Sequence, residues 1–165
     1  MEMAELTNLE SKLGEVLGLA MAAQGATQKV KKLPELQADL ARKLDEMHDE
    51  AKETEQRATE VASSFEGKKT AILEEAREVK QKATEMMQEY LDGDSDALDG
   101  FEFLTMAEAG EVGHWEILKT LNQRARHVGL EALVDWAIPI QQRHFENARE
   151  GSLELAAEED PNETS

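Results

Sequence analysis

Two segments of the chain place a histidine three residues after a side chain with a metal-binding oxygen. Glu111 lies three residues before His114, and Gln141 lies three residues before His144. Positions i and i+3 share one face of a helix, so each pair can direct two ligand atoms at one point. Carboxylate and imidazole together suit iron, manganese or zinc. The two pairs therefore predict a metal site between two helices.

Both histidines lie at the centre of an apolar face when the flanking segments are drawn as helices over residues 101–128 and 130–150. His114 comes fifteen residues before Gly129 and His144 fifteen residues after it. In an antiparallel hairpin that turns at Gly129, both would lie about 22 Å from the turn and face each other. The alternative is that each histidine is an ordinary core residue with one hydrogen bond.

The same spacing recurs in the first half of the chain. Glu15 precedes Asp45 by 30 residues and His48 by 33, as Glu111 precedes Gln141 and His144. This repeat predicts a second pair of helices with equivalent ligands. Coincidence remains an alternative, because acidic residues are common in this chain.

Helical periodicity does not favour every member of this second set. Asp45 lies nearly opposite the main apolar stripe of its helix, and His48 lies on the flank of that stripe. Glu46 is the nearest alternative to Asp45. Glu15 lies on a face of small residues. Either these helices bury a second face, or the ligands assigned in the first half are wrong.

Five helices are needed to position these residues. Thr7 and Glu10 match a capping box, with a helix expected to run to about Lys32, and Pro34 suits the first turn of the next helix. The glycines of the first helix favour close packing against a neighbour. The second helix is expected to run to about residue 65 and the third over 66–91, followed by a linker over 92–100. The fourth helix is expected over 101–128, ending at Gly129, and the fifth over 130–150, with a kink at Pro139. Residues 151–165 are expected to form an acidic, flexible tail. Residues 1–150 form one expected domain.

The acidic linker superficially suggests a calcium loop. Asp92 would begin the loop, but its sixth and twelfth positions hold Ala97 and Phe103 instead of the glycine and glutamate of an EF-hand. A solvated turn that caps the next helix is therefore the favoured interpretation.

Composition narrows the function further. The 165 residues carry a net charge of −18 and include no cysteine, which argues against nucleic acid, anionic membranes, disulfides and cysteine nucleophiles as the basis of function. No apolar run approaches the length of a membrane span, and the acidic start lacks the basic residues of a signal peptide. We therefore expect a cytoplasmic, acidic, all-α protein.

At this point the chain resembles the ferritin-like di-iron carboxylate superfamily, with the YciE/YciF stress-associated ferritin-like proteins as the nearest branch. The resemblance covers residues 8–150 and rests on Lys32-Leu33-Pro34-Glu35-Leu36, on His114-Trp115-Glu116-Ile117 followed by Thr120, Leu121 and Gly129, and on an extra helix between two hairpins. It implies a four-helix bundle of two antiparallel hairpins with an additional crossover helix. The metal ligands that it implies, with His114 as an extra candidate, are Glu15, Asp45, His48, Glu111, Gln141 and His144.

Two departures from the family pattern bear on the metal. The family has four carboxylates, whereas Gln141 is neutral and Asp45 replaces a glutamate, so three carboxylates remain. A site with less negative charge binds two divalent ions less strongly. The resemblance therefore implies iron as the cofactor, in a di-iron, mononuclear or vestigial site, with manganese or zinc as alternatives. Dioxygen or peroxide is the implied partner, in iron oxidation or peroxide handling during stress.

The principal alternative is a helical interaction protein without a metal. In that case the histidines are core residues, and the charged helix at 66–91 is a surface for a partner or for a homodimer. A lipid-coat or carrier protein is disfavoured because the polar faces are acidic rather than basic.

Overall fold

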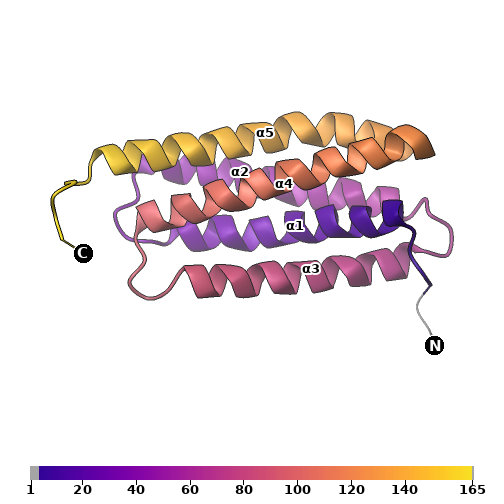
Figure 1. Ribbon diagram of the computed structural model, residues 1–165, viewed down its shortest axis with the longest axis horizontal. Coiled ribbons are helices and arrows are strands. Elements are labelled where there is room, and N and C mark those ends of the chain that lie inside the picture. The colour runs from indigo at the N-terminus through magenta and orange to yellow at the C-terminus, as the bar shows by residue number, and fades with distance from the viewer. Residues whose placement is uncertain (1–3, 165) are drawn as a thin grey trace.

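The computed structural model describes residues 4–164, and within these residues the chain is entirely α-helical and turn, with no strand. The helices are α1 (Asn8–Lys31), α2 (Ala38–Ala62), α3 (Lys69–Tyr90), α4 (Ala97–Ala125) and α5 (Val128–Ala157) (Figure 1). The all-α class and the five expected helices are thereby confirmed. Among the described residues, no helix is both long enough and apolar enough to cross a bilayer.

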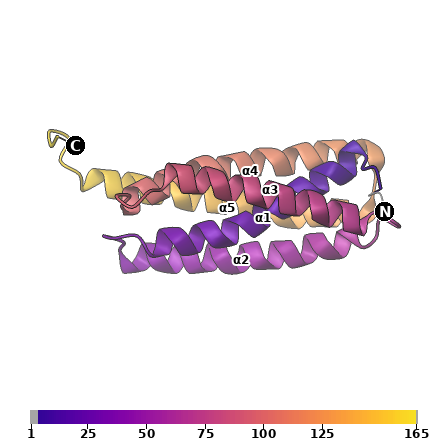
Figure 2. The same cartoon turned by 90° about the horizontal axis from the view of Figure 1, so that it is seen from below.

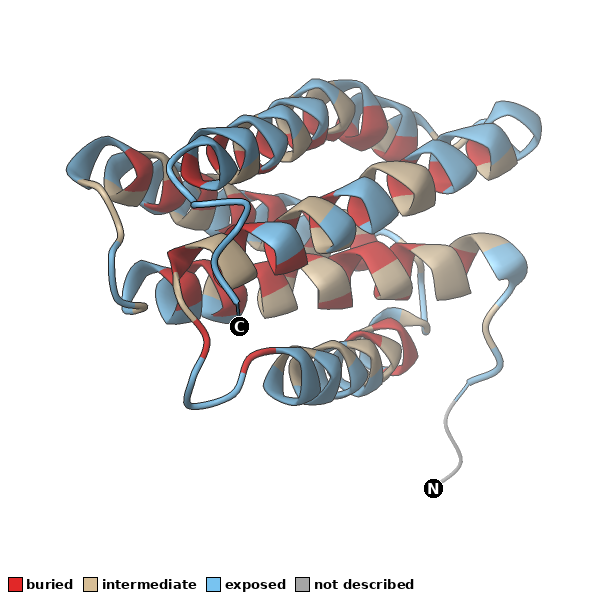
Figure 3. Ribbon diagram, turned by 60° about the vertical axis from the view of Figure 1, so that its left-hand side comes forward, coloured by how far each residue is buried: buried red, intermediate tan, exposed pale blue. Residues whose placement is uncertain are grey.

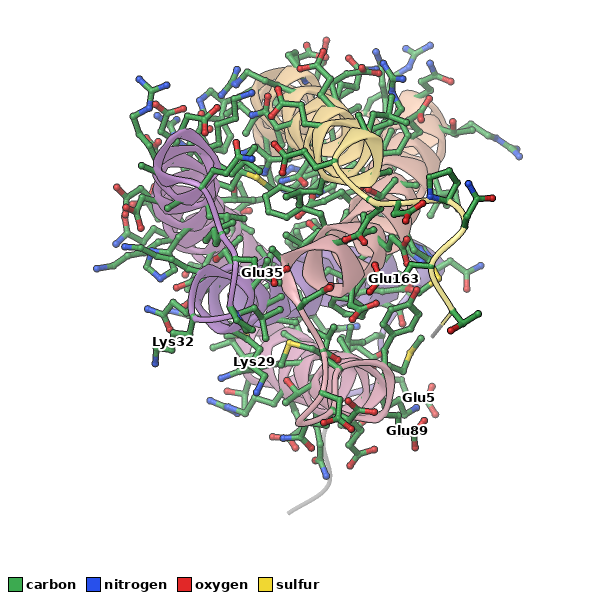
Figure 4. All side chains as sticks on the ribbon, turned by 90° about the vertical axis from the view of Figure 1, so that its left-hand side faces the viewer. Glu5, Lys29, Lys32, Glu35, Glu89 and Glu163 are labelled. Carbon is green, nitrogen blue, oxygen red and sulfur yellow. The ribbon has the colours of Figure 1, made fainter. Side chains whose placement is uncertain are left out.

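Each helix runs antiparallel to the one before it in the chain (Figures 1 and 2). α1 packs against α2 and α4, and α5 packs against α4 and α2, so these four helices enclose one core. α3 packs mainly against α1, outside the group of four. In the end-on view, α3, with Glu89 labelled, lies on the side away from α5 (Figure 4).

The helices differ in how many sides they bury. α1 carries buried or half-buried residues on most of its circumference, whereas α3 buries only Ala71, Ile72 and Ala76 (Figure 3). The expected close packing of the α1 glycines is confirmed at two positions. A Cβ at Gly14 would lie 2.9 Å from Ile72 O, and a Cβ at Gly18 would lie 2.4 Å from Ala76 O. Gly25 has no atom within 4 Å of its Cβ position, so packing does not explain that glycine.

The apolar core is divided into two clusters, one toward each end of the bundle. One cluster includes Leu17 of α1 and Trp115 of α4, and the other includes Val30 of α1 and Leu104 of α4. Between the clusters, at mid-length, lie several buried polar side chains: Thr54, Glu108, Glu111, Gln141 and His144. The apolar ends hold the helices together, and the middle of the bundle is the polar region.

Several helix ends differ from those expected from the sequence. α2 begins at Ala38 rather than at Pro34, because Pro34 lies in the preceding turn and Glu35 has a positive φ of 69°. α4 begins at Ala97 rather than at Phe101, because Asp96 and Asp99 form a capping box at the start. The predicted capping box at Thr7 is confirmed.

The turn between α4 and α5 also differs from the expected one. α4 ends at Ala125, where Arg126 takes the left-handed conformation with φ 56°, and Gly129 lies inside the first turn of α5. The sequence suggested that Gly129 ends the fourth helix, and this expectation is wrong. α5 continues without interruption through Pro139 and past residue 150, and it buries Gly151 and Leu155.

The side chain of Asn122 holds this turn. Its Nδ2 donates to His127 O at 3.0 Å, and its Oδ1 accepts from His127 N at 3.0 Å. Replacing Asn122 by alanine removes both bonds from a buried position, so we expect the free energy of unfolding to fall by about 1–3 kcal/mol. Urea unfolding measures this loss. The exposed neighbour Gln123, replaced by alanine, is the control and should change stability little; an equal loss in both variants would contradict the role of Asn122.

Candidate metal centre

Four buried polar residues of α4 and α5 form what we call the polar centre: Glu108, Glu111, Gln141 and His144. Each is at most 4% exposed. One carboxyl oxygen of Glu108, one of Glu111 and the amide oxygen of Gln141 have no hydrogen-bond partner among the described residues. Buried polar groups are normally hydrogen-bonded. Three unpartnered oxygens in one region therefore call for an explanation.

The position of the α4–α5 turn explains why these residues lie at the same level. Glu111 comes fifteen residues before Arg126 and Gln141 fifteen residues after it. Glu108 and His144 are each eighteen residues from Arg126. Residues equally far from the turn of an antiparallel hairpin lie at the same height along it. Glu111 and Gln141 therefore lie at one level along the hairpin, and Glu108 and His144 lie at another.

The electrostatics of the two glutamates differ sharply from those of exposed carboxylates. Burial raises the pKa of Glu108 to about 8. Burial also raises the pKa of Glu111 well above its usual range, and the neighbouring carboxyl of Glu108 raises it further. No basic side chain lowers either pKa. At neutral pH the carboxyl of Glu108 therefore favours the protonated, uncharged form, and burial shifts the pKa of Glu111 in the same direction.

His144 is held from the opposite side by α2. Its Nε2 lies 3.0 Å from Oε1 of Glu50, and Arg143 also contacts that carboxylate. Partial burial works to raise the pKa of Glu50, but the hydrogen bonds from Arg143 and His144 outweigh it and hold this pKa below its usual range. Burial lowers the pKa of His144 despite the attraction of Glu50. The neutral imidazole then donates from Nε2, which leaves the lone pair on Nδ1.

The faces of α1 and α2 that point toward the middle of the bundle carry almost no side-chain atoms that could bind a metal. Their buried residues at mid-length are Ala20 and Ala23 on α1 and Ala51 and Thr54 on α2. The Thr54 hydroxyl donates to Glu50 O in its own helix. Glu50 and Glu55 of α2 are half-buried; Glu50 contacts His144, whereas Glu55 accepts from Gln24 of α1. The donor groups at the middle of the bundle are therefore concentrated on one hairpin.

The structure brings Glu15 and His114 together, away from His144. Oε1 of Glu15 lies 3.2 Å from Nδ1 of His114, and Lys12 contacts both side chains. His114 is half-exposed and contacts α1, whereas His144 is buried and contacts α2. The expectation that the two histidines face each other is therefore wrong. The cause is the turn at Arg126, which places Glu108 instead of His114 at the level of His144.

The candidates on α2 lie at the surface of the bundle. Asp45 is more than half exposed and forms an ion pair with Lys31 at 2.8 Å. His48 is half-buried, with its Nε2 3.2 Å from Nε2 of Gln28. Glu46, the alternative to Asp45, is exposed. The buried side of this part of α2 is instead formed by Leu44 and Met47, so none of these acids reaches the polar centre.

Sequence reasoning missed Glu108 and Glu50. Glu108 carries a usable signal, because it lies three residues before Glu111 and four after Leu104, on the same helical face. Glu50 lies three residues after Met47 at the edge of the apolar stripe of α2, but many acids on this helix have similar positions. Only the tertiary contact with His144 distinguishes it.

Among residues 4–164, no group of three or more histidine, aspartate or glutamate side chains is placed to hold a metal ion together. The polar centre offers two carboxyl groups and one amide oxygen that lack hydrogen-bond partners, while its imidazole, that of His144, is bonded to Glu50. The chain matches no protein-family model, no curated protein and no solved structure, so its candidate site is judged on its own geometry and chemistry.

Proposed function

We propose that this protein is a ferritin-like bundle that binds one divalent cation at the polar centre, through Glu108, Glu111 and Gln141. The observation that carries the proposal is the pair of buried glutamates without a basic partner. Burying carboxylates is costly unless a cation pairs with them. A divalent ion would offset that cost and would use the unpartnered oxygen atoms of all three side chains.

The arrangement of the helices supports the ferritin-like part of the proposal. The α1–α2 and α4–α5 hairpins pack against each other, and α3, which lies outside them, connects the first hairpin to the second (Figure 1). The donors lie at mid-length in this bundle. Against a di-iron centre stand Ala20, Ala23, Ala51 and Thr54, which occupy the middle of α1 and α2 where further ligands would be needed. We therefore propose a single ion, and Glu15, Asp45 and His48 are not part of its site.

The donor set favours iron or manganese. Carboxylate and amide oxygens suit manganese, and carboxylate-rich sites in helical bundles also hold iron. His144 donates to Glu50 and is not part of this donor set. A bound iron or manganese ion would supply redox chemistry toward dioxygen or peroxide, which is the stress-related activity implied by the resemblance. The protein would contribute the buried carboxylates and the exclusion of water by the apolar ends of the core.

Metal content tests the proposal. Protein purified from cells supplied with iron and manganese should contain close to one ion per chain, measured by elemental analysis. The double variant E108Q/E111Q should lose the ion, because two anionic ligands become neutral amides of the same shape. The matched control is E15Q/D45N, which removes two carboxylates from the surface and should keep the ion.

Two other outcomes of this metal analysis would contradict the proposed site. Loss of metal in the control alone would place the site at the first-half residues. Metal-free protein whose melting temperature does not respond to added Mn²⁺ or Fe²⁺ would reject the cation altogether. That result would favour the non-metal interaction protein, with the polar centre as a pair of buried neutral acids.

A further inference from the structure

A cavity of about 270 Å³ lies between α1, α3 and α4. Its walls are apolar and come from all three helices; they include Leu19, Ala22, Ala83, Met87, Phe103 and Ala107. The cavity opens to solvent beside the exposed residues Met86, Met106 and Gly110. A bound metal ion would not fill this apolar space, which leaves room for a ligand.

Small residues create this space. Ala22 and Ala26 on α1, Ala83 on α3, and Ala107 and Gly110 on α4 all line the cavity. A Cβ placed at Gly110 would have no atom within 4 Å. Met86 and Met106, which are 60% and 52% exposed, also line the cavity. Methionine side chains are flexible and adapt to apolar ligands.

Two of the three titratable residues that line the cavity are acidic. Glu108 and Glu111 line it, and each has a buried oxygen without a partner. His114 is the only other titratable residue of the lining, which contains no lysine or arginine. An anionic ligand would add negative charge beside two buried acids, and a neutral alcohol would bring no counter-charge, whereas a cation would favour the ionised form of both carboxyl groups. A cationic group attached to an apolar tail fits both parts of the lining.

We propose that this cavity binds a small amphiphilic amine, whose ammonium group pairs with Glu108 and Glu111 and whose alkyl or aryl part lies among the alanine and methionine side chains. The volume is slightly below the usual range for drug-sized ligands, which indicates a short chain. The inference does not depend on a metal. Because both cations use the same glutamates, amine and metal should exclude each other.

Calorimetric titration of the metal-free protein with butylamine, hexylamine and octylamine tests this directly. Each added methylene should tighten binding about fourfold until the cavity is full, the equivalent of about 0.8 kcal/mol per buried methylene. Hexanol and hexanoate should bind at least tenfold more weakly than hexylamine. Equal binding of hexanol would show that the carboxyl pair does not recognise the ligand and would overturn the proposal, as would the absence of saturable amine binding.

Two glycines of α4 provide matched variants. Gly110→Leu places a side chain at the cavity and should weaken hexylamine binding at least tenfold. Gly113→Leu is the control, since its Cβ position is also free of atoms within 4 Å and Gly113 does not line the cavity. Equal binding by both variants would contradict the cavity as the site. Titration of Gly110→Leu with Mn²⁺ separates the two proposals, because this variant keeps both glutamates and should still bind the ion.

Discussion

In cation-free protein, replacing Glu108 by glutamine should raise the free energy of unfolding at neutral pH by roughly 3 kcal/mol. The unfolded glutamate has its ordinary pKa of 4.5, whereas burial raises the pKa in the folded state to about 8. Folding at neutral pH must therefore take up a proton. Glutamine has nearly the same shape and carries no charge at any pH, so it removes that cost.

The sign of the pH dependence follows from the same shift. A group with a raised folded pKa leaves stability intact below its unfolded pKa and lowers it as the pH rises toward the folded value. The wild-type protein should thus lose stability steadily between pH 4.5 and about 8. In Glu108→Gln this slope should be much smaller. Glu111 contributes in the same direction, so the double variant E108Q/E111Q should be the least sensitive to pH.

Urea unfolding at several pH values across this window measures both effects. Glu102→Gln is the matched control, because Glu102 lies on the same helix with its side chain exposed. The control should follow the wild-type curve. If wild type and Glu108→Gln show the same slope, the carboxyl of Glu108 is not buried in the folded protein. Added Mn²⁺ should stabilise wild type but not the double variant, which links the measurement to the proposed cation.

The unequal distribution of polar groups between the two hairpins is the main chemical feature of the bundle. α4 and α5 carry Glu108, Glu111, Gln141 and His144 at mid-length, whereas α1 and α2 place mostly alanine there. Under the two proposals, small residues leave room for a ligand and the buried acids favour a cation. The same two glutamates would then serve a metal ion or an ammonium group, depending on which is present.

Much of the architecture was predictable from the sequence. Apolar residues at three- and four-residue spacing, the capping box at Thr7 and the break near Gly67 indicated helices close to those found. The burial of His144 also followed from periodicity, since it lies at the centre of an apolar face, whereas His114, at the centre of the corresponding face of α4, is only half-buried. These are local properties, fixed by the pattern of each helix alone.

The partners across the bundle were not predictable in the same way. The level of each α4 residue relative to α5 depends on where the turn lies, and Arg126 takes the left-handed conformation that Gly129 was expected to provide. A turn three residues earlier in the chain places Glu108 instead of His114 at the level of His144, and Glu111 at the level of Gln141. On α2, equal sequence spacing did not ensure an equal face, because Leu44 and Met47 turn Asp45 outward.

A valine at Gly18 should cost about 3 kcal/mol or more of unfolding free energy, because Gly18 makes the closer of the two glycine contacts between α1 and the backbone of α3. A Cβ at Gly18 would lie 2.4 Å from Ala76 O and 2.8 Å from Val79 Cβ. The backbone of α3 would have to move away from α1, on which it mainly packs. Since α3 also forms one wall of the cavity, its displacement should abolish amine binding as well.

Gly25→Val is the matched control for this change. Gly25 lies on the same helix, is exposed, and has no atom within 4 Å of its Cβ position. Valine there should leave stability within about 0.5 kcal/mol of wild type. Urea unfolding gives the two free energies, and limited trypsin digestion should cut Gly18→Val sooner at Lys80 and Lys82 on α3. Equal stability and equal digestion of the two variants would show that α3 is not held by close contact with α1, and the cavity between them would lose its structural basis.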